Sequence, residues 1–303
     1  MSDLLSPPSP ELDESHFTKL AHYAKQLGRA PQARRLSMKT GEHRSRQKGH
    51  GMEMLELRPY QASDDLRHID WRVTARTGQA HTRLYAQEND HQRMLLVDLS
   101  HNAYFATRHT FIATRLNQLA GLIAWRSMQQ GDKLGYRLSY GQKDFYGQAK
   151  QGIATLIQQL VDACRVHHRQ STKESLAIWQ HPMITSKVHN QDIIILTDHQ
   201  EIPLASEVAL QSLAKHNHVH WVQIIDSQMF NLPSGHYQFA DPQGTQSVQV
   251  NRSSQQKAKQ NYFSQNTKVR QKLARMGVHY QLFDINEPPE NIARSLLKQG
   301  ALR

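Results

Sequence analysis

The sequence predicts an α/β fold, in which a doubly wound, mostly parallel sheet follows a small β-rich N-terminal module. From residue 91 onward, short apolar runs alternate with longer segments whose apolar residues recur at helical spacing. The runs RMLLVD (93–98) and DIIILTD (192–198) are almost wholly apolar up to a closing aspartate, as expected of buried strands. Alternating strands and helices imply crossover connections and therefore parallel pairing.

The elements of the α/β region follow in order. Strands are expected at 93–98, 133–138, 143–147 (a short edge strand), 192–198, 218–225 and 278–284. Helices are expected at 110–130, 152–166, 203–217, from the end of the hairpin to Met276, and at 289–299. Gly131 closes the first of these helices and Pro203 lies in the first turn of the third, both common positions for these residues. A β-hairpin is expected at 236–250, around Asp241 to Gly244.

The chain is expected to have three parts. Residues 1–40 hold a tail, a helix that ends at Gly28 and the start of a basic linker. Residues 41–90 form a β-rich module, with strand-like runs at 52–60 and 81–89 that turn-prone residues separate. Residues 91–303 form the α/β domain, which carries the hairpin near 236–250 as an insertion.

Bulk composition limits the class of protein. A hydrophobic content of 38% over 303 residues supports a folded core. Neither a stretch of about 18–20 apolar residues nor a signal-peptide pattern occurs, so a cytoplasmic location is expected. The single cysteine, Cys164, excludes disulfides within the chain and cysteine-based zinc sites, and its helical context predicts a buried thiol. The 19 histidines are scattered; His218 and His220 share a strand face without a third ligand nearby, so no zinc site is expected.

A formal net charge of +11 indicates an anionic partner, and the basic residues concentrate in segment 28–49. No aromatic platform or helix-turn-helix pattern accompanies this segment, so sequence-specific nucleic-acid recognition is not expected. Weak, salt-sensitive, nonspecific binding to nucleic acid is expected through Arg34, Arg35, Arg44, Arg46 and Lys48. Binding to an anionic membrane surface is an open alternative for the same charges.

Polar residues follow two of the predicted strands. Asp98 and Asp198 end their strands, and in a doubly wound sheet ligands bind beyond the carboxyl ends, where the strand order reverses. Ser100 and Asn102 alternate with Asp98, and the loop RQSTKESL supplies Thr172 next to Ser171. Taken together, these oxygens form a set that suits Mg²⁺ or Mn²⁺. Taken singly, each residue could instead cap the helix that follows it.

Several other kinds of site are not indicated. Ser100 lacks the Gly-x-Ser-x-Gly elbow of hydrolases, so nucleophilic catalysis is not predicted. Neither Gly-x-x-x-x-Gly-Lys-Ser/Thr nor a strand followed by Gly-x-Gly-x-x-Gly occurs, so no nucleotide pocket is predicted. An ATP-driven step would therefore have to come from a partner.

A long ordered set of residues lies between positions 45 and 76. These residues are Ser45, Gly49, Gly51, Glu53, Arg58, Tyr60, Asp64, Asp65, Arg67, Ile69, Asp70, Trp71, Ala75 and Arg76. They match the pattern Ser-x-x-x-Gly-x-Gly-x-Glu, Arg-x-Tyr, Asp-Asp-x-Arg-x-Ile-Asp-Trp and Ala-Arg of the DUF58 family, which the chain closely resembles from Gly41 onward over nearly its whole length. So long an ordered signature is highly specific.

The resemblance implies a von Willebrand factor A-like domain with a metal-ion-dependent adhesion site, written Asp-x-Ser-x-Ser with a later Thr and a later Asp. Asp98 and Ser100 match the first two positions, Asn102 departs from the third, and Thr172 and Asp198 fit the later ones. The resemblance also implies action with a MoxR-type AAA+ ATPase in assembling or activating other complexes. The expected function is thus a non-enzymatic adaptor between such an ATPase and an unknown client protein.

The acids of the signature have a physical interpretation of their own. Asp64, Asp65 and Asp70 interleave with arginines 67, 72 and 76, which predicts ion pairs that lock an irregular loop, with Trp71 as a buried anchor. The competing hypothesis is a metal-dependent phosphodiesterase or nuclease. In that case these three acids, or Asp98 with Asp198, would hold the catalytic metal, and the basic linker would bind nucleic acid.

Overall fold

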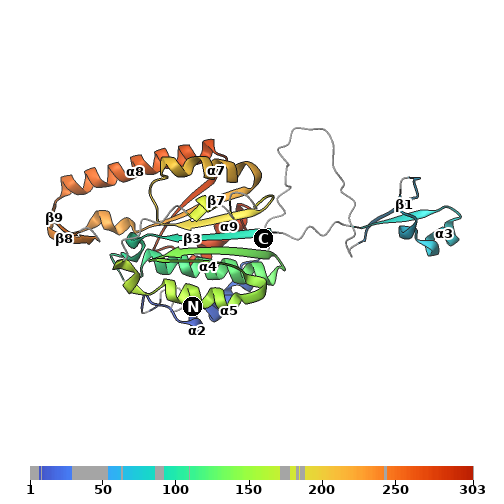
Figure 1. The fold of residues 1–303 in the computed structure, drawn as a ribbon, viewed down its shortest axis with the longest axis horizontal. Helices are drawn as coiled ribbons and strands as arrows, with labels where there is room; N and C mark the ends of the chain where they lie inside the picture. The colour runs from blue at the N-terminus through green and yellow to red at the C-terminus, as the bar shows by residue number, and fades with distance from the viewer. Residues whose placement is uncertain are drawn as a thin grey trace. The chain divides into compact units, whose positions relative to one another are not determined.

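The computed structural model of this chain describes residues 7, 9–28, 54–62, 64–85, 92–108, 110–170, 178–181, 184, 188–241 and 244–302. The chain divides into two compact units, one formed by residues 1–33 with 91–303 and the other by residues 34–90. Figure 1 shows the helices and strands of both.

The larger unit is built on a six-stranded sheet in the order β10-β7-β6-β3-β4-β5. Its strands are β3 (Gln92–Leu99), β4 (Lys133–Tyr140), β5 (Lys143–Gln148), β6 (Asp192–Thr197), β7 (His218–Ile225) and β10 (His279–Asp284). Neighbouring strands pair in parallel except β5, which pairs antiparallel with β4 at one edge. The prediction of an α/β fold with a mostly parallel sheet is confirmed.

The chain order reverses between β3 and β6. From β3 the chain moves outward through β4 and β5, and it then returns to form β6, β7 and β10 on the other side. The carboxyl ends of β3 and β6 therefore flank the point at which open sheets of this kind bind ligands. Their register sets Asp98 opposite Thr197, so the residues after each strand leave the sheet at the same edge.

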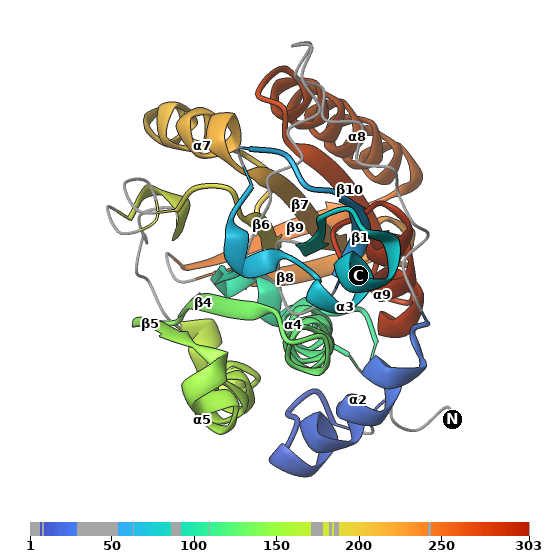
Figure 2. The same cartoon turned by 90° about the vertical axis from the view of Figure 1, so that its right-hand side faces the viewer.

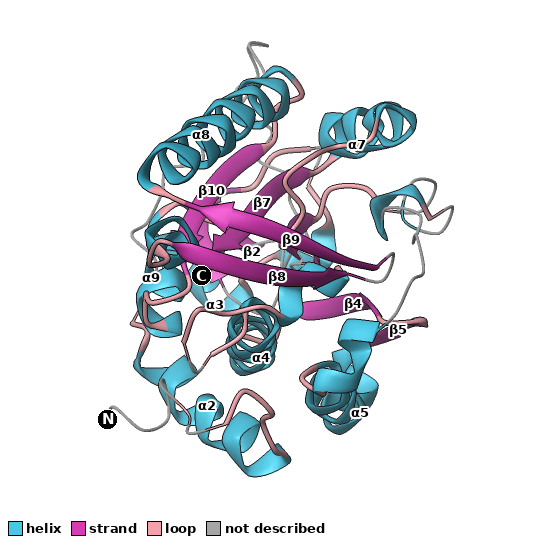
Figure 3. Ribbon diagram, turned by 90° about the vertical axis from the view of Figure 1, so that its left-hand side faces the viewer, coloured by secondary structure: helices cyan, strands magenta, loops and turns pink. Residues whose placement is uncertain are grey.

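Helices cover both faces of this sheet (Figures 2 and 3). The helices of the unit are α2 (Glu14–Gln26), α4 (Ile112–Gln129), α5 (Ala149–Ala163), α7 (Leu204–His216), α8 (Arg252–Arg275) and α9 (Pro289–Lys298). Short 3₁₀ turns are η2 (His101–Tyr104), η3 (Val166–Gln170), η4 (Ile178–Gln180) and η5 (Ser227–Asn231). Alternation along β3 separates the two layers: Leu95 and Val97 join the core under α2, α4, α5 and α9, whereas Leu96 joins the core under α7 and α8.

Helix α2 belongs to the larger unit because it packs on α4. Its apolar stripe buries Phe17 and Leu20, and Phe17 lies so close to Gly121 that a β-carbon there would meet its ring at 2.8 Å. The Asp13 carboxylate caps the helix by accepting a hydrogen bond from the His16 main-chain nitrogen at 2.9 Å. Helix α4 is buried along most of its length, and Gly131 follows it in the left-handed region at φ 74°.

The smaller unit contains the antiparallel pair β1 (Met54–Pro59) and β2 (His81–Tyr85), the 3₁₀ turn η1 (Leu66–His68) and helix α3 (Trp71–Thr77). The prediction of an irregular loop in this segment is wrong, because its residues form η1 and α3. Asp65 accepts a hydrogen bond from the Arg67 nitrogen at the start of η1, and Asp70 accepts from two nitrogens at the start of α3. Gly78 ends α3 in the left-handed conformation, which a glycine adopts without strain.

Two further features complete the fold. Strands β8 (Gly235–Asp241) and β9 (Gly244–Val250) form the hairpin expected from the sequence, before α8. Across the ranges that the structure covers, the helices fall short of the length and apolarity that a bilayer span needs.

Two buried histidines make the larger unit sensitive to acid. Burial lowers the pKa of His220 to about 3 and that of His16 to about 4, whereas histidines of the unfolded chain titrate near 6.5. The unfolded state therefore binds more protons, and stability that is complete above pH 6.5 is lost as the pH falls toward 4. At pH 5 each histidine is expected to cost about 1–2 kcal/mol. Urea denaturation at pH 7.5 and pH 5 measures this loss.

The His220→Leu variant is the control for that measurement. Since leucine does not titrate, this variant should show a smaller difference in stability between the two pH values than the unchanged protein. An equal difference in both proteins would mean that His220 is not a source of the acid sensitivity.

Candidate functional site

Asp98 and Asp198 lie at the carboxyl ends of the two central strands. Asp98 is the penultimate residue of β3, and Asp198 directly follows β6. Both are buried, with 3% and 7% of their surface exposed. A carboxylate is costly to bury unless it is paired or binds a cation, so each has to be compensated by its neighbours.

Ser100 links the two strand ends. Its main-chain nitrogen donates to Asp198 Oδ1 at 2.9 Å, and its hydroxyl donates to Asp198 Oδ2 in a short hydrogen bond. The same hydroxyl oxygen accepts a hydrogen bond from the Asn102 nitrogen at 3.0 Å and so caps η2. The capping alternative is therefore right for Ser100. It is wrong for Asp198, because α7 begins only at Leu204 and Asp198 binds Ser100 instead.

His199 is a member of this site that the sequence analysis missed. Its Nε2 lies 3.4 Å from Asp98 Oδ2, and its main-chain nitrogen donates to Thr197 Oγ1. Burial by itself would lower the pKa of His199, but the hydrogen bond and charge of Asp98, together with the charge of Asp198, raise it to about 9. At neutral pH an imidazolium therefore compensates the two carboxylates. Its position directly after Asp198 was the available sequence signal.

The other predicted metal ligands are Asn102 and Thr172, and only Asn102 lies among the residues that the structure describes. Asn102 is exposed, and its contact within the site is the main-chain hydrogen bond to Ser100. Thr172 and Ser171 lie outside the described residues, as do the basic linker residues Arg34, Arg35, Arg44, Arg46 and Lys48 and the signature residues Ser45, Gly49, Gly51 and Glu53. The structure thus joins Ser100 to Asp198 by hydrogen bonds, and it places Asp98 at the same sheet edge, where its partner is His199.

This donor set fits a hard divalent cation. Two carboxylates and a hydroxyl supply the charge and the oxygen atoms that Mg²⁺ prefers, and three protein ligands are fewer than its usual six. The protonated His199 is a competing cation that a metal ion would have to displace from Asp98. The set does not resemble a nucleophilic triad, because His199 faces Asp98 whereas the Ser100 hydroxyl donates to Asp198.

The signature acids have structural partners other than those expected. Asp64 pairs with Arg58 at 2.6 Å, and Asp70 pairs with Arg83 at 2.9 Å. The prediction that these acids pair with arginines 67, 72 and 76 is therefore wrong, and those arginines are exposed. The actual partners lie on or beside the two strands, so the ion pairs join η1 and α3 to the β1–β2 ribbon.

Trp71 is not the buried anchor that the sequence suggested. As the first residue of α3 it is 68% exposed, and nearby Leu66 is 63% exposed. The segment forms α3 instead of a loop, and the buried residue at its start is Asp70, which caps the helix and pairs with Arg83.

These positions predict opposite effects for two neighbouring substitutions. Asp70→Ala should lower the melting temperature, because it removes the cap of α3 and the partner of Arg83. Trp71→Ala should change stability by less than about 0.5 kcal/mol, as is usual for exposed positions. Paired thermal melts followed by circular dichroism measure both. A larger loss for Trp71→Ala than for Asp70→Ala would contradict the assigned roles.

Cys164 is the buried thiol that the sequence predicted. It is fully buried at the end of α5, and Asn117 Nδ2 donates to its sulfur at 3.5 Å. Burial raises the pKa of the thiol to about 12, so the sulfur stays protonated and poorly nucleophilic at neutral pH.

Comparisons with known proteins place these features in a family context. The profile of the family described as "Protein of unknown function DUF58" matches residues 56–272, which include the signature acids, the strand-end site and most of α8. Over 101 residues the chain is 33% identical to the uncharacterized proteins Rv1480 of Mycobacterium tuberculosis and Mb1516 of Mycobacterium bovis. That alignment covers 33% of this chain and 32% of each relative, so it spans about a third of their length.

Proposed function

This chain belongs to the DUF58 family, and on that premise we propose that it is a non-enzymatic adaptor that works with a MoxR-type AAA+ ATPase to assemble or activate a client protein complex. Its α/β unit would act as a von Willebrand factor A-like domain. Contact with the partner would pass through a metal-ion-dependent adhesion site at the ends of β3 and β6.

The observation that carries the proposal is the binding of Ser100 to Asp198 at the sheet edge where Asp98 also lies. Ser100 and Asp198 are 98 residues apart in sequence, yet they bind one another through two hydrogen bonds. A capping role for Ser100 needs neither of these bonds. Ordering two distant segments and burying a carboxylate both cost free energy. A ligand site at the point where the strand order reverses would account for this arrangement.

Asp98, Ser100 and Asp198 would hold Mg²⁺ or Mn²⁺, with Asn102 and Thr172 as the further residues of the pattern. The ion, when bound, would supply an open coordination position for a carboxylate of the partner protein. Asp98 and Asp198 supply the negative charge, while the Ser100 nitrogen and hydroxyl orient the Asp198 carboxylate.

The structure of the smaller unit favours this proposal over a nuclease. A nuclease site at Asp64, Asp65 and Asp70 needs carboxylates that converge on one ion. Asp64 is instead paired with Arg58, Asp70 with Arg83, and Asp65 caps η1. The arrangement supports a structural role for this part of the signature.

The test is the Mg²⁺ dependence of partner binding. The full chain is immobilised, and binding of the MoxR-type ATPase from the same organism is measured with Mg²⁺ or with EDTA. The unchanged protein should bind in Mg²⁺ and lose affinity in EDTA. Asp98→Ala should bind at least about tenfold more weakly in Mg²⁺, because a principal anionic ligand is gone.

Glu14→Ala is the matched control, since it removes an exposed carboxylate of α2 far along the chain from the site. It should bind as the unchanged protein does. Equal binding by Asp98→Ala and Glu14→Ala, with both variants folded, would show that the strand-end site does not contact the ATPase.

A further inference from the structure

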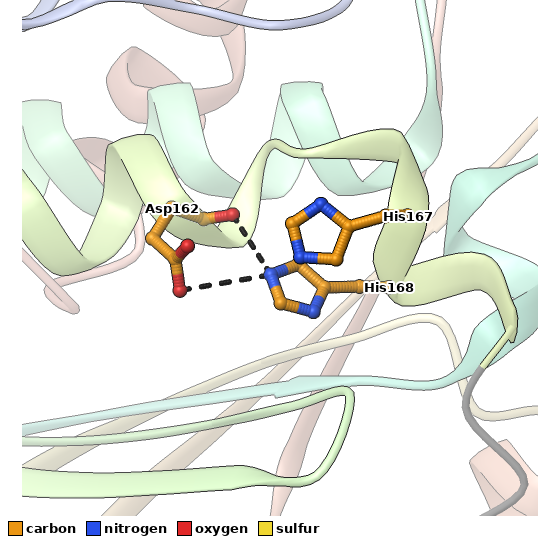
Figure 4. A group of neighbouring side chains, drawn as sticks. All are labelled: Asp162, His167 and His168. Carbon is orange, nitrogen blue, oxygen red and sulfur yellow. Dashed lines mark hydrogen bonds and ion pairs between the residues drawn. The ribbon is translucent and has the colours of Figure 1, made fainter.

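A second cluster of possible metal ligands lies where α5 ends. Asp162 is in the last turn of α5, and His167 and His168 follow in η3 (Figure 4). One ligand atom from each of the three side chains lies within 4.8 Å of the other two. This cluster is separate from the strand-end site and contains imidazole nitrogens as well as a carboxylate.

The spacing of these atoms is close to that of a metal centre. His168 Nε2 lies 3.6 Å from Asp162 Oδ2, and the two imidazole rings are 4.1 Å apart between centroids. Two ligands that each lie about 2.0–2.1 Å from a tetrahedral zinc ion are about 3.3–3.4 Å from one another. Small rotations of the three side chains would therefore bring them to coordination distance.

His168 is held firmly in place by its surroundings. It is 5% exposed, and its ring packs against that of Tyr140 in a T-shaped arrangement with centroids 4.9 Å apart. Gly141 leaves room for it: a β-carbon there would lie 2.6 Å from His168 Nδ1, and the φ of +57° also favours glycine. With Nδ1 toward Gly141, Nε2 faces Asp162 (Figure 4). His167, by contrast, is exposed, so the cluster opens to solvent.

A neighbouring hydroxyl group also orients the carboxylate ligand. The Tyr140 hydroxyl donates to Asp162 Oδ2 at 2.9 Å and fixes the carboxylate.

A metal ion would have to displace two existing interactions. Lys143 Nζ lies 2.6 Å from Asp162 Oδ2, and His168 Nε2 lies 3.1 Å from the Asp162 main-chain oxygen. The side chain of Lys143 is 45% exposed, so it can turn into solvent when an ion takes its place. The ammonium now neutralises the same carboxylate that the metal would use, which makes Lys143 a competitor.

We propose that Asp162, His167 and His168 form a binding site for a divalent transition-metal ion of the zinc class. Two imidazoles and one carboxylate form a donor set that binds zinc, nickel or copper in preference to magnesium. Three protein ligands leave a coordination position open on the exposed side, beside His167. The site therefore differs in metal preference from the all-oxygen site at Asp98 and Asp198.

Isothermal titration with Zn²⁺, in a buffer without competing chelators, tests the proposal on the full chain. The unchanged protein should bind one Zn²⁺ more tightly than its scattered surface histidines do. His167→Ala should weaken this tightest site at least about tenfold without loss of fold, because His167 is exposed. Lys143→Gln should strengthen it, since the competing ammonium is removed while the fold is kept.

Two controls make the result specific. His236→Ala removes an exposed histidine of β8 and should leave the tightest site unchanged. Co²⁺ provides a second readout, because a site of low coordination number gives intense visible absorption bands, which His167→Ala should abolish. The proposal is overturned if no tight Zn²⁺ site is found, if His167→Ala binds like the unchanged protein, or if Asp198→Ala removes the tight site instead.

Discussion

Replacing Asp132 by alanine is expected to lower the free energy of unfolding by about 3–5 kcal/mol, the usual loss when one partner of a buried ion pair is removed. Arg93 Nη1 lies 2.7 Å from Asp132 Oδ2, and the two side chains are 1% and 5% exposed. Arg93 also donates to the Ser127 hydroxyl at 2.6 Å. In the variant, the guanidinium stays buried at the start of β3 and loses its ion pair with Asp132.

Two further variants serve as controls for Asp132→Ala. The double variant Arg93→Met/Asp132→Leu removes both charges and should lose less stability than Asp132→Ala, because it also removes the buried guanidinium that Asp132→Ala leaves behind. Asp144→Ala breaks the ion pair with Arg137. Because the Asp144 side chain is 39% exposed, this loss should cost less than about 1 kcal/mol.

Urea denaturation at pH 7.5 measures all three variants. A loss below 1 kcal/mol for Asp132→Ala, similar to that of Asp144→Ala, would show that the Arg93–Asp132 pair contributes no more than a surface pair does.

Magnesium is expected to stabilise the unchanged protein by about 2.7 kcal/mol at a free concentration one hundred times its dissociation constant, if the strand-end site binds it. Asp98→Ala should show almost no response, because it removes one of the two carboxylates. Asn102→Ser should respond more strongly, since a hydroxyl restores the family pattern and is smaller than the amide. Thermal-shift titrations with Mg²⁺ and Mn²⁺ measure the three proteins side by side.

The response to metal is the quantity to compare, because Asp98→Ala also changes the metal-free protein. Asp98 pairs with His199, whose raised pKa means that the pair stabilises the fold below pH 6.5 and loses this contribution as the pH rises through about 9. The variant should therefore start from a lower melting temperature at neutral pH. Flat responses in all three proteins would mean that the chain keeps this site's geometry without binding its ion.

The sequence by itself determined the strands and main helices of the larger unit and the place of the candidate site. The apolar runs of β3 and β6 and the recurring apolar residues of α4 indicate buried elements, so the positions of these elements could be predicted from periodicity. Alternation of strands and helices predicted the parallel sheet, and the strand-end aspartates predicted where the order reverses. The DUF58 signature likewise needs only the order of residues along the chain.

The partners of charged side chains could not be predicted in this way. Asp70 was expected to pair with an arginine of its own segment, but it pairs with Arg83 on β2, 13 residues away. Trp71 was expected to be the buried anchor of a locked loop, yet as the first residue of α3 it is exposed. In both cases the direction of a side chain depends on where its helix lies against the β-ribbon, and local sequence does not record that.

Only the tertiary structure decided which distant groups meet. It brought Ser100 to Asp198 across 98 residues, paired Arg93 with Asp132, and turned His199 toward Asp98. It also set His168 against Asp162, where Tyr140 and Gly141 of the neighbouring strand and turn hold the ring. The physical reason is that periodicity reports whether a side chain faces the interior, whereas its neighbours there are fixed by the strand order and the packing of helices on the sheet.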